Sequence, residues 1–485
     1  MDNAIRDKYT AVIGLEIHAQ LNTNSKAFSS DQNQYGSTPN SNVSPISLGH
    51  PGTLPRLNEK SFEYGIKLGL ACDSDITRYN EFSRKNYFYA DLPKGYQITQ
   101  FDTPICTGGS VRIRLEDGSK KEIGLTRIHI EEDSGKSIHD IDPFNSLVDL
   151  NRAGVPLLEI VTEPEIASAE EAYEYLVEVR KLVRYLEVCD GNMEEGSMRC
   201  DANISVMLNG AKEFGEKVEV KNMNSIRNVK RAIEFEIERQ IELCESSTII
   251  ASETRGFDAT NGTTIQMRGK EGVNDYRFFP EPDLLPYVVT DEKIASVRES
   301  MPTLPNELLE TYTNTYGLSE YDALNIIDSK EIGQYYNQVV QLTTHYKAAA
   351  NWIMGEVKSH LNKLGISISE FQITPSQIAE IIELIRSNKI SNSIASQKLF
   401  PALLENPTST AKSLAESLDL IQNSNQDDLA NVIDSVFEGF PDEASRIKSG
   451  EMKLIGFFMG KIMKASGGKA DPKITNKILM QKIKS

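Results

Sequence analysis

The sequence predicts an α+β protein, in which a large first domain with an antiparallel β-sheet is followed by two smaller all-α domains. The chain has 485 residues, enough for about three domains. Residues 9–289 contain short alternating runs separated by Gly, Pro and Asn, which is typical of strands and loops. From about residue 296 helical periodicity takes over, and a Ser/Thr/Asn-bearing stretch lies near residue 410. We therefore expect three domains, 1–295, 296–410 and 411–485.

Four runs in the first domain alternate strictly between polar and apolar residues, so each predicts a strand with one polar side. The runs are Val12–Leu21, Arg127–Glu131, Arg199–Val206 and Lys217–Lys221. Their polar sides carry Glu16, His18, Glu131, Asp201 and Asn203. A solvated sheet face would explain any one run. Together they offer the oxygen-rich ligands of a hard cation plus one imidazole, which favours a magnesium-type site if the strands are neighbours.

Two helices of the first domain have readable starts. Ser168 and Glu171 form a capping box before an apolar stripe over 175–186, and Ser225 precedes a second stripe over 229–241. Both stripes are typical of core packing rather than of ligand binding.

Other polar groups are candidates for substrate contact. Glu194 and Glu195 lie beside Gly196, which lets a backbone approach a ligand closely. Cations suited to phosphate oxygens are Arg84, Lys85, Arg199 and Lys221. A P-loop is excluded, because Ile130 stands where its first glycine belongs. The sequence also contains no Rossmann fingerprint, G-x-S-x-G elbow or H-E-x-x-H helix.

The composition narrows the class of protein. No run approaches the roughly 20 apolar residues of a membrane span, so we expect a soluble protein. The start of the chain lacks a secretory signal, which favours the cytoplasm.

The protein is acidic. Lys and Arg total 52 against 70 Asp and Glu, and the net charge of −18 argues against nonspecific coating of nucleic acid by the whole surface. Five irregularly spaced cysteines indicate neither disulfides nor a zinc knuckle.

Several long motifs carry a family resemblance, and they occur in the family's order. They are residues 12–18, 84–98, 147–154, 193–203, 275–283 and 351–355. These segments resemble the B subunits of the aspartyl/glutamyl-tRNA amidotransferases, and the likeness covers essentially the whole chain. It implies a cradle-shaped catalytic domain, a helical domain and a small helical tail similar to the YqeY family.

The resemblance also implies a reaction and partners. ATP would phosphorylate the side-chain carboxylate of Glu on mischarged tRNA-Gln, of Asp on mischarged tRNA-Asn, or of both, and ammonia would displace the phosphate. The ammonia would come through a channel from the family's amidase, its A subunit, with a small C subunit completing a heterotrimer. Nothing in the chain resembles the Ser/Gly-rich amidase signature.

By residue, the resemblance implies Mg²⁺ ligands at Glu16, His18 and Glu131, with Asp201 acting through water. Lys85 matches an active-site position. ATP phosphates would contact Arg84, Lys85 and Arg199. Glu194, Glu195 and Arg199 are weaker catalytic candidates, for orientation or for deprotonating ammonium; either glutamate could instead pair with an arginine.

One segment departs from the family pattern. Many members carry zinc-binding cysteines where this chain has Ser29, Asp31, Ser44 and Ser47. Serine hydroxyls cannot replace thiolates as zinc ligands. We predict no structural zinc, and expect packing and hydrogen bonds to hold this loop.

The tail is locally cationic although the protein is acidic. Candidate contacts to tRNA phosphates are Lys461, Lys464, Lys469, Lys473 and Lys477. A solvated terminal helix would also explain these lysines. Two other functions stay open: a noncatalytic tRNA-binding module, and a stand-alone metal-dependent phosphotransferase, which the absence of a recognised nucleotide loop disfavours.

Overall fold

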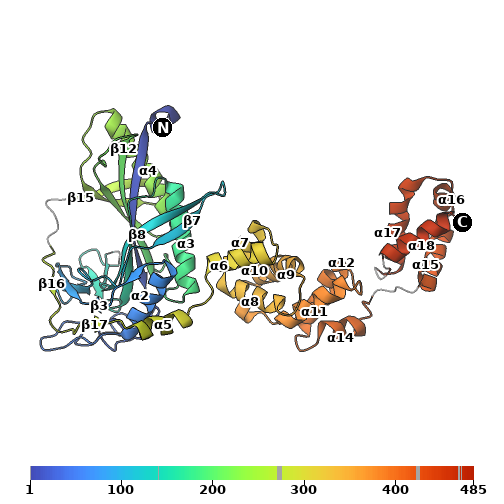
Figure 1. The fold of residues 1–485 in the computed structure, drawn as a ribbon, viewed down its shortest axis with the longest axis horizontal. Helices are drawn as coiled ribbons and strands as arrows, with labels where there is room; N and C mark the ends of the chain where they lie inside the picture. Colours follow the sequence, from blue (N-terminus) through green and yellow to red (C-terminus); the bar gives the residue numbers. More distant parts are fainter. Residues whose placement is uncertain are drawn as a thin grey trace. The chain divides into compact units, whose positions relative to one another are not determined.

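The computed structural model describes residues 2–139, 141–269, 276–421, 426–467, 470 and 472–484. Packing divides the chain into two compact units, Met1–Pro305 and Asn306–Ser485 (Figure 1). The finer three-domain division stays a prediction. Across the described ranges, no helix combines the length and apolar character that a bilayer crossing requires.

The first unit is built on one large sheet. Of its described strands, thirteen join this sheet, whose main path runs β15-β14-β13-β12-β1-β11-β8-β5-β4-β16. All pairs on the path are antiparallel except β13 and β14, which are parallel, so the predicted antiparallel sheet is in fact mixed. Strands on the path span Tyr9–Gln20 (β1), Ser83–Asn86 (β4), Tyr96–Thr99 (β5), Lys120–Glu132 (β8), Pro156–Thr162 (β11), Met198–Leu208 (β12), Val218–Met223 (β13), Glu253–Asp258 (β14), Thr263–Gly269 (β15) and Phe279–Pro280 (β16).

The remaining strands are short. Three join the large sheet off its main path: Asp75–Ile76 (β2), Cys106–Thr107 (β6) and Ser110–Arg114 (β7). Two small sheets pair Lys136–Ile138 (β9) with Leu147–Asp149 (β10), and Tyr79–Asn80 (β3) with Tyr287–Val288 (β17).

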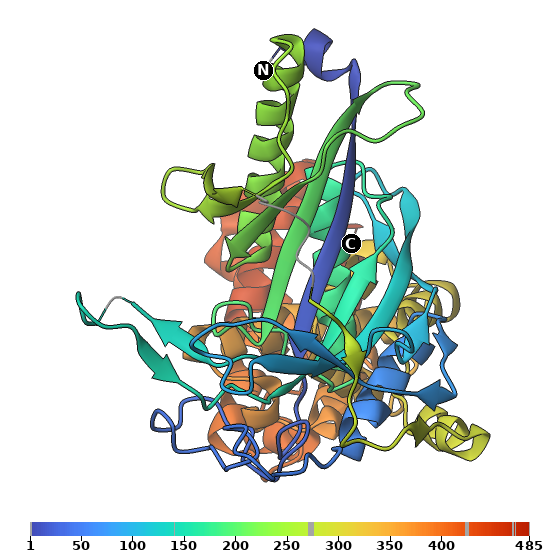
Figure 2. The same ribbon diagram turned by 90° about the vertical axis from the view of Figure 1, so that its left-hand side faces the viewer.

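All four predicted strands are present, as β1, β8, β12 and β13. β1 and β12 pair along nearly their whole length and lie side by side in Figure 2 (blue and green). β1 and β8 are not neighbours, because β11 lies between them. Sequence periodicity did not predict this intervening strand.

Helices cover the apolar side of the sheet. Ile13, Leu15 and Ile17 are fully buried and belong to one core with residues of α2 (Glu59–Ala71), α3 (Ala169–Tyr185) and α4 (Ile226–Glu245). This leaves the opposite, polar side of β1, β8, β11 and β12 for a functional site. Two short helices, α1 (Asn3–Arg6) and α5 (Asp291–Glu299), complete the unit.

The predicted helix starts are confirmed, with one change. Ser168 caps α3 by accepting from the N–H of Glu171, and Ser225 caps α4 by accepting from the N–H of Asn228. The Glu171 carboxylate accepts from the N–H of Ala167, one residue before the cap, rather than from Ser168. The second hydrogen bond of the capping box is therefore made with Ala167, one residue before the predicted Ser168.

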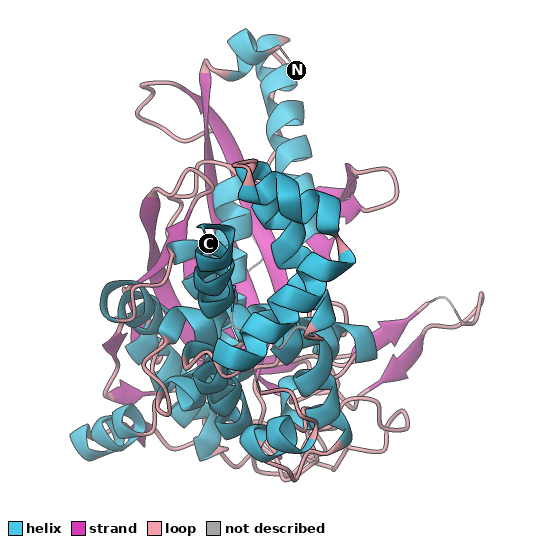
Figure 3. Cartoon of the chain, turned by 90° about the vertical axis from the view of Figure 1, so that its right-hand side faces the viewer, coloured by secondary structure: helices cyan, strands magenta, loops and turns pink. Residues whose placement is uncertain are grey.

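The second unit is helical in its described residues, as predicted (Figures 1 and 3). Its named elements are α6 (Pro305–Glu310), η1 (Thr311–Thr315), α7 (Glu320–Ile327), α8 (Lys330–Val340), α9 (Tyr346–Trp352), η2 (Ile353–Val357), α10 (Lys358–Leu364), η3 (Ile368–Glu370), α11 (Pro375–Arg386), α12 (Asn392–Ile394), η4 (Ala395–Leu399), α13 (Phe400–Glu405), α14 (Ala411–Ser417), α15 (Gln426–Gly439), α16 (Pro441–Lys448), η5 (Met452–Leu454), α17 (Ile455–Ala465) and α18 (Pro472–Lys484). Helices α15 to α18 share an apolar core that includes Ile433, Phe458 and Leu479.

We predict that Gly69→Ala destabilises the first unit. A Cβ at Gly69 of α2 would lie 2.8 Å from Ile76 Cδ1 and closer still to Cys106 Sγ, so these two side chains or the helix would have to shift within a closely packed core. Such overpacking costs about 1–3 kcal/mol. Urea unfolding of the first unit measures the loss. The matched control is Gly460→Ala in α17, where the added methyl meets open space and should stabilise by about 1 kcal/mol; equal effects at both positions would contradict the packing argument.

Candidate active site

A row of ionisable side chains crosses the polar side of the sheet. His18 of β1 stands opposite Glu159 of β11, and Glu159 stands opposite His129 of β8. Directly opposed residues of antiparallel strands project from the same face. Three adjacent strands therefore supply an imidazole, a carboxylate and a second imidazole in one line, and Glu131 extends the line along β8.

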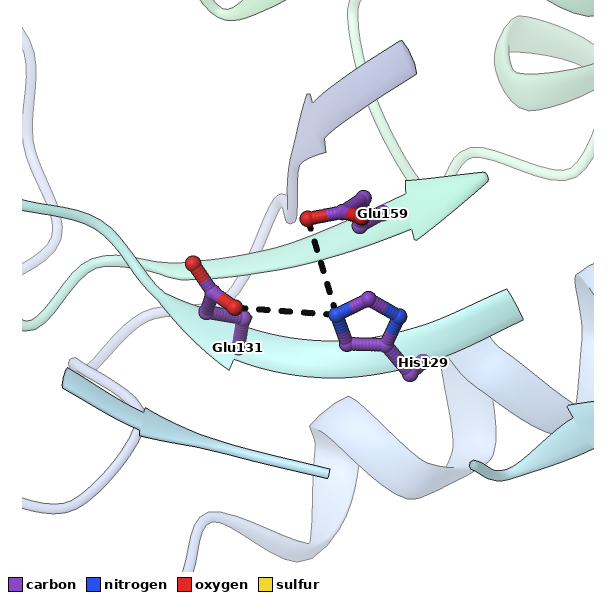
Figure 4. Close-up of side chains that lie close together, drawn as sticks. All are labelled: His129, Glu131 and Glu159. Carbon is purple, nitrogen blue, oxygen red and sulfur yellow. Dashed lines mark ion pairs between the residues drawn. The ribbon is translucent and has the colours of Figure 1, made fainter. Parts of the chain in front are cut away.

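The four side chains are within contact distance, and we call them the carboxylate–histidine cluster. His18 Nε2 lies 3.3 Å from Glu159 Oε2, and His129 Nε2 lies 3.6 Å from both Glu159 Oε2 and Glu131 Oε2. Figure 4 shows the His129 ring turned toward the two carboxylates. One ligand atom from each of His129, Glu131 and Glu159 lies within 4.8 Å of the other two.

Both carboxylates of the cluster are buried and ionised. Burial raises the pKa of Glu131, but the Lys85 ammonium, 3.6 Å from its Oε1, and the contact with His129 together outweigh burial, so the pKa is lowered. Burial likewise raises the pKa of Glu159, yet His129 and His18 hold that pKa well below its ordinary value. In return, Glu131 and Glu159 raise the pKa of Lys85 against the effect of burial. These charges depend on one another.

The pKa of His18 depends on the same neighbouring charges. Burial favours its neutral form, but contact with Glu159 and the charge of that carboxylate outweigh burial, so the pKa of His18 is raised above 6.5. The attraction between imidazolium and carboxylate therefore stabilises the fold fully below pH 6.5 and fades as the pH rises through the higher folded value.

The cluster fits a hard divalent cation. Glu131 Oε2 is buried and has no hydrogen-bond partner among the described residues, although buried polar atoms nearly always have one. Two carboxylates and an imidazole are suitable donors for such an ion. Of the four predicted ligands, Glu131 and His18 belong to the carboxylate–histidine cluster, and Glu131 is one of the three residues whose ligand atoms lie within 4.8 Å of one another.

The other two predicted ligands lie near the cluster but have protein partners. Glu16 Oε1 accepts from Asn203 Nδ2 at 2.9 Å, and Asp201 Oδ2 accepts from Lys221 Nζ at 2.5 Å. The assignment of four specific ligands stays a prediction.

A cavity of about 350 Å³ opens over the cluster, within the roughly 300–1,000 Å³ range of small-molecule sites. It is lined by Glu16, His18, Lys85, Thr99, Gln100, Phe101, Arg127, His129, Glu131, Glu159, Asp201, Glu219, Lys221, Tyr276 and Phe278. All four predicted metal ligands and Lys85 therefore meet in one place. The cations Lys85, Arg127 and Lys221 share it with the carboxylates.

Glu159 was missed by the sequence reasoning. It lies in the otherwise apolar run Pro156–Thr162, whose residues are mostly buried. Alternation, the signal used for the other strands, is absent from such a run. A single carboxylate within an apolar strand is itself a signal, because a buried charge requires a partner.

Two predicted phosphate contacts are not among the lining residues, because carboxylates already hold their guanidinium groups. Arg199 Nη2 donates to the buried Asp133 Oδ2 at 2.6 Å. Arg84 donates to both oxygens of Glu281, at 2.6 and 2.8 Å, and to Asp283 at 3.1 Å. Arg199 is thus a structural partner of Asp133, and Arg84 ties β4 to the segment after β16.

Glu194 and Glu195 are exposed, lie in the loop between α3 and β12, and are not among the lining residues. Their N–H groups donate to Asn192 Oδ1 at 3.0 and 3.3 Å, which shapes the loop. The alternative role of these glutamates, pairing with an arginine, stays a prediction.

In the tail, Lys464, Lys473 and Lys477 are exposed. Lys461 is half-buried, with its ammonium 4.6 Å from the Phe440 ring centroid. Lys469 lies outside the described residues.

The loop predicted to lack zinc brings Ser29, Asp31, Ser44 and Ser47 together, and we call these residues the serine cluster. Ser47 Oγ donates to Asp31 Oδ2, and Ser44 N donates to the same oxygen at 2.9 Å. The hydroxyls of Ser29 and Ser47 lie 3.3 Å apart. Burial raises the pKa of Asp31, but bonds from Ser47 and Ser44 outweigh it and lower the pKa. Hydrogen bonds hold this loop.

We predict that Glu159→Gln lowers the pKa of His18 in metal-free protein. With the carboxylate gone, burial and the Arg199 charge still favour the neutral ring and only the Asp201 charge opposes them, so the pKa of His18 falls. A pH titration of the His18 ring by NMR, assigned with His18→Gln, measures the change. The signal of His345, in the second unit, should be identical in both proteins. A His18 titration unaffected by the substitution would contradict the proposed coupling.

Known proteins match this chain over nearly its whole length. Residues 11–295 match the family model described as the GatB/GatE catalytic domain, and residues 334–483 match the GatB domain. The aspartyl/glutamyl-tRNA(Asn/Gln) amidotransferase B subunit from Crocosphaera subtropica is 48% identical, over 98% of this chain and 97% of its own. Proteins of the same name from Thermodesulfovibrio yellowstonii and Geotalea daltonii are 46% and 47% identical, over 98% of this chain and 100% and 99% of theirs. The chain therefore belongs to the family of aspartyl/glutamyl-tRNA amidotransferase B subunits.

Proposed function

We propose that this chain is the transamidating subunit of a glutamine-dependent tRNA amidotransferase. It uses ATP to activate the side-chain carboxylate of Glu-tRNA(Gln), Asp-tRNA(Asn) or both, and ammonia then replaces the phosphate to give the amide. The observation that carries this proposal is the cluster of ionised carboxylates and histidines, in which a buried Glu131 oxygen has no hydrogen-bond partner among the described residues, in a cavity that Lys85 also lines.

The chemistry explains why the site combines so many charges. A carboxylate is a poor acyl donor and a carboxyl phosphate is a good one, so two anions must be brought together before amide formation. Mg²⁺ bound at His129, Glu131 and Glu159, with His18, Glu16 and Asp201 close by, would neutralise charge on the transferring phosphoryl group.

The chain's own cations complete the site. Lys85, a compact ammonium 3.6 Å from Glu131, is suited to a phosphate oxygen once the substrate enters. Arg127 and Lys221 line the same cavity and add positive charge on other strands. Arg84 and Arg199 act through the carboxylates that they hold, keeping the surrounding backbone in place.

Partners and tRNA contacts follow from the same proposal. Ammonia would come from an amidase, the A subunit of the enzyme, braced by a small C subunit in a cytoplasmic heterotrimer. Exposed Glu194 and Glu195 would orient the substrate or accept a proton from ammonium. The lysines of the tail would bind tRNA phosphates through local charge on an acidic protein.

We predict that Glu131→Gln in the assembled enzyme lowers kcat/KM for conversion of Glu-tRNA to Gln-tRNA by at least about 100-fold. The amide cannot supply the anionic ligand, so the Mg²⁺ concentration required should also rise. Equilibrium tRNA binding should stay within about twofold, because Glu131 is buried on the sheet.

Glu122→Gln is the matched control, since Glu122 lies on the same strand but is half exposed. Wild-type turnover in Glu131→Gln would eliminate the metal assignment. A parallel loss of tRNA binding would favour the noncatalytic tRNA-binding module.

We predict that Lys473→Ala combined with Lys477→Ala weakens tRNA binding and lowers its salt dependence. The two exposed lysines lie one turn apart on α18. Losing two phosphate contacts should reduce the slope of log Kd against log salt by about 2. Lys482→Ala is the control, because it removes a positive charge from the same helix at a residue that is not among the predicted phosphate contacts. An unchanged slope would leave these lysines as a solvated helix face.

A further inference from the structure

One end of the cavity is aromatic, although its floor is charged. Phe101, Tyr276 and Phe278 line this end, and we call them the aromatic wall. The Phe101 and Phe278 rings are stacked, with centroids 4.1 Å apart and planes at 13°. Tyr276 meets Phe278 edge-on, with centroids 5.9 Å apart. The wall is thus an ordered stack of rings whose outer flat face can meet a ligand, rather than a loose apolar patch.

Folding alone does not account for the position of Phe101. Its side chain follows β5 and remains 53% exposed even though one face of the ring is stacked on Phe278. Neither ring belongs to the apolar core on the helix-covered side of the sheet. An aromatic ring left half exposed at the mouth of a polar cavity favours a ligand with a flat apolar face.

The wall is joined to the charged floor through one side chain. The Lys85 ammonium lies 5.4 Å from the centroid of the Tyr276 ring and 3.6 Å from Glu131 Oε1. A single ligand in this cavity therefore meets a flat aromatic surface at one end and cations beside paired carboxylates at the other. A nucleotide has this chemistry, with a planar base at one end and phosphate or acyl oxygens at the other.

We propose that the aromatic wall stacks the adenine ring of a substrate nucleotide, with Phe101 making the principal contact. This inference rests on the proposed function, whose two substrates both carry adenine, ATP as its base and the acceptor tRNA as its terminal adenosine. The wall recognises the ring by shape and stacking, while the carboxylate–histidine cluster and Lys85 act on the charged end.

The test compares ligands with and without the base. In the assembled enzyme, Phe101→Leu keeps an apolar side chain but removes the flat face, and Phe101→Tyr keeps it. Loss of one base–aromatic stack should weaken binding about 5- to 150-fold. If the ring belongs to ATP, Phe101→Leu weakens ATP binding by this factor and leaves inorganic tripolyphosphate binding unchanged.

If the ring belongs to the acceptor end, Phe101→Leu weakens full-length tRNA binding and leaves tRNA lacking its terminal adenosine unchanged. In either case Phe101→Tyr binds the ligand with an affinity within about threefold of wild type. Phe278→Leu weakens binding of the same ligand, but by a smaller factor than Phe101→Leu. Phe214→Leu is the control, because Phe214 is 62% exposed and lies outside the cavity.

Base-dependent binding that Phe101→Leu leaves unchanged for both ATP and tRNA would overturn the proposal. Wild-type conversion of Glu-tRNA to Gln-tRNA, measured in parallel, separates the two conclusions. If the wild-type enzyme converts Glu-tRNA to Gln-tRNA and Phe101→Leu leaves base-dependent binding unchanged, the proposed role of the aromatic wall is wrong and the proposed function is unaffected. With no conversion by the wild-type enzyme, the proposed function fails, and the ATP and tripolyphosphate pair still decides whether the wall binds a base.

Discussion

The shared contact of two histidines with one buried carboxylate, Glu159, is the interaction on which the rest of the site depends. Glu159 is held between β1 and β8, so it fixes the charge state of His18 and sets the field at His129 and Glu131. A buried anion requires compensating charge. The sheet provides that charge from two neighbouring strands, and the site is therefore built into the regular hydrogen-bonded backbone rather than into a loop.

Because the site is built on strands, the pairing register of these strands decides which side chains reach it. In a strand, a shift by one residue moves every side chain to the opposite face. The apolar side of β1, with Ile13, Leu15 and Ile17 buried under helices, opposes such a shift. The core that stabilises the first unit thus also keeps His18 on the polar side, and stability and site geometry are secured by the same alternation.

Local patterns predicted much of this arrangement. Period-two alternation was sufficient for β1, β8, β12 and β13 and for the side on which Glu16, His18, Glu131 and Asp201 lie. It was not sufficient for β11, which is apolar on both faces apart from Glu159 and Thr162, or for its place between β1 and β8. The partners of Arg199 and Arg84 lie 66 and 197 residues away in sequence, so pairing over such distances left no local signal.

The serine cluster has a consequence for the conditions that the first unit tolerates. Its loop is tied by hydroxyl groups and the Asp31 carboxylate, and the five cysteines lie elsewhere, four of them buried. Thiol oxidants, which loosen loops held by cysteine thiolates, find no thiol among these four side chains. Oxidation of the protein's thiols would therefore not break the hydrogen bonds that hold this loop.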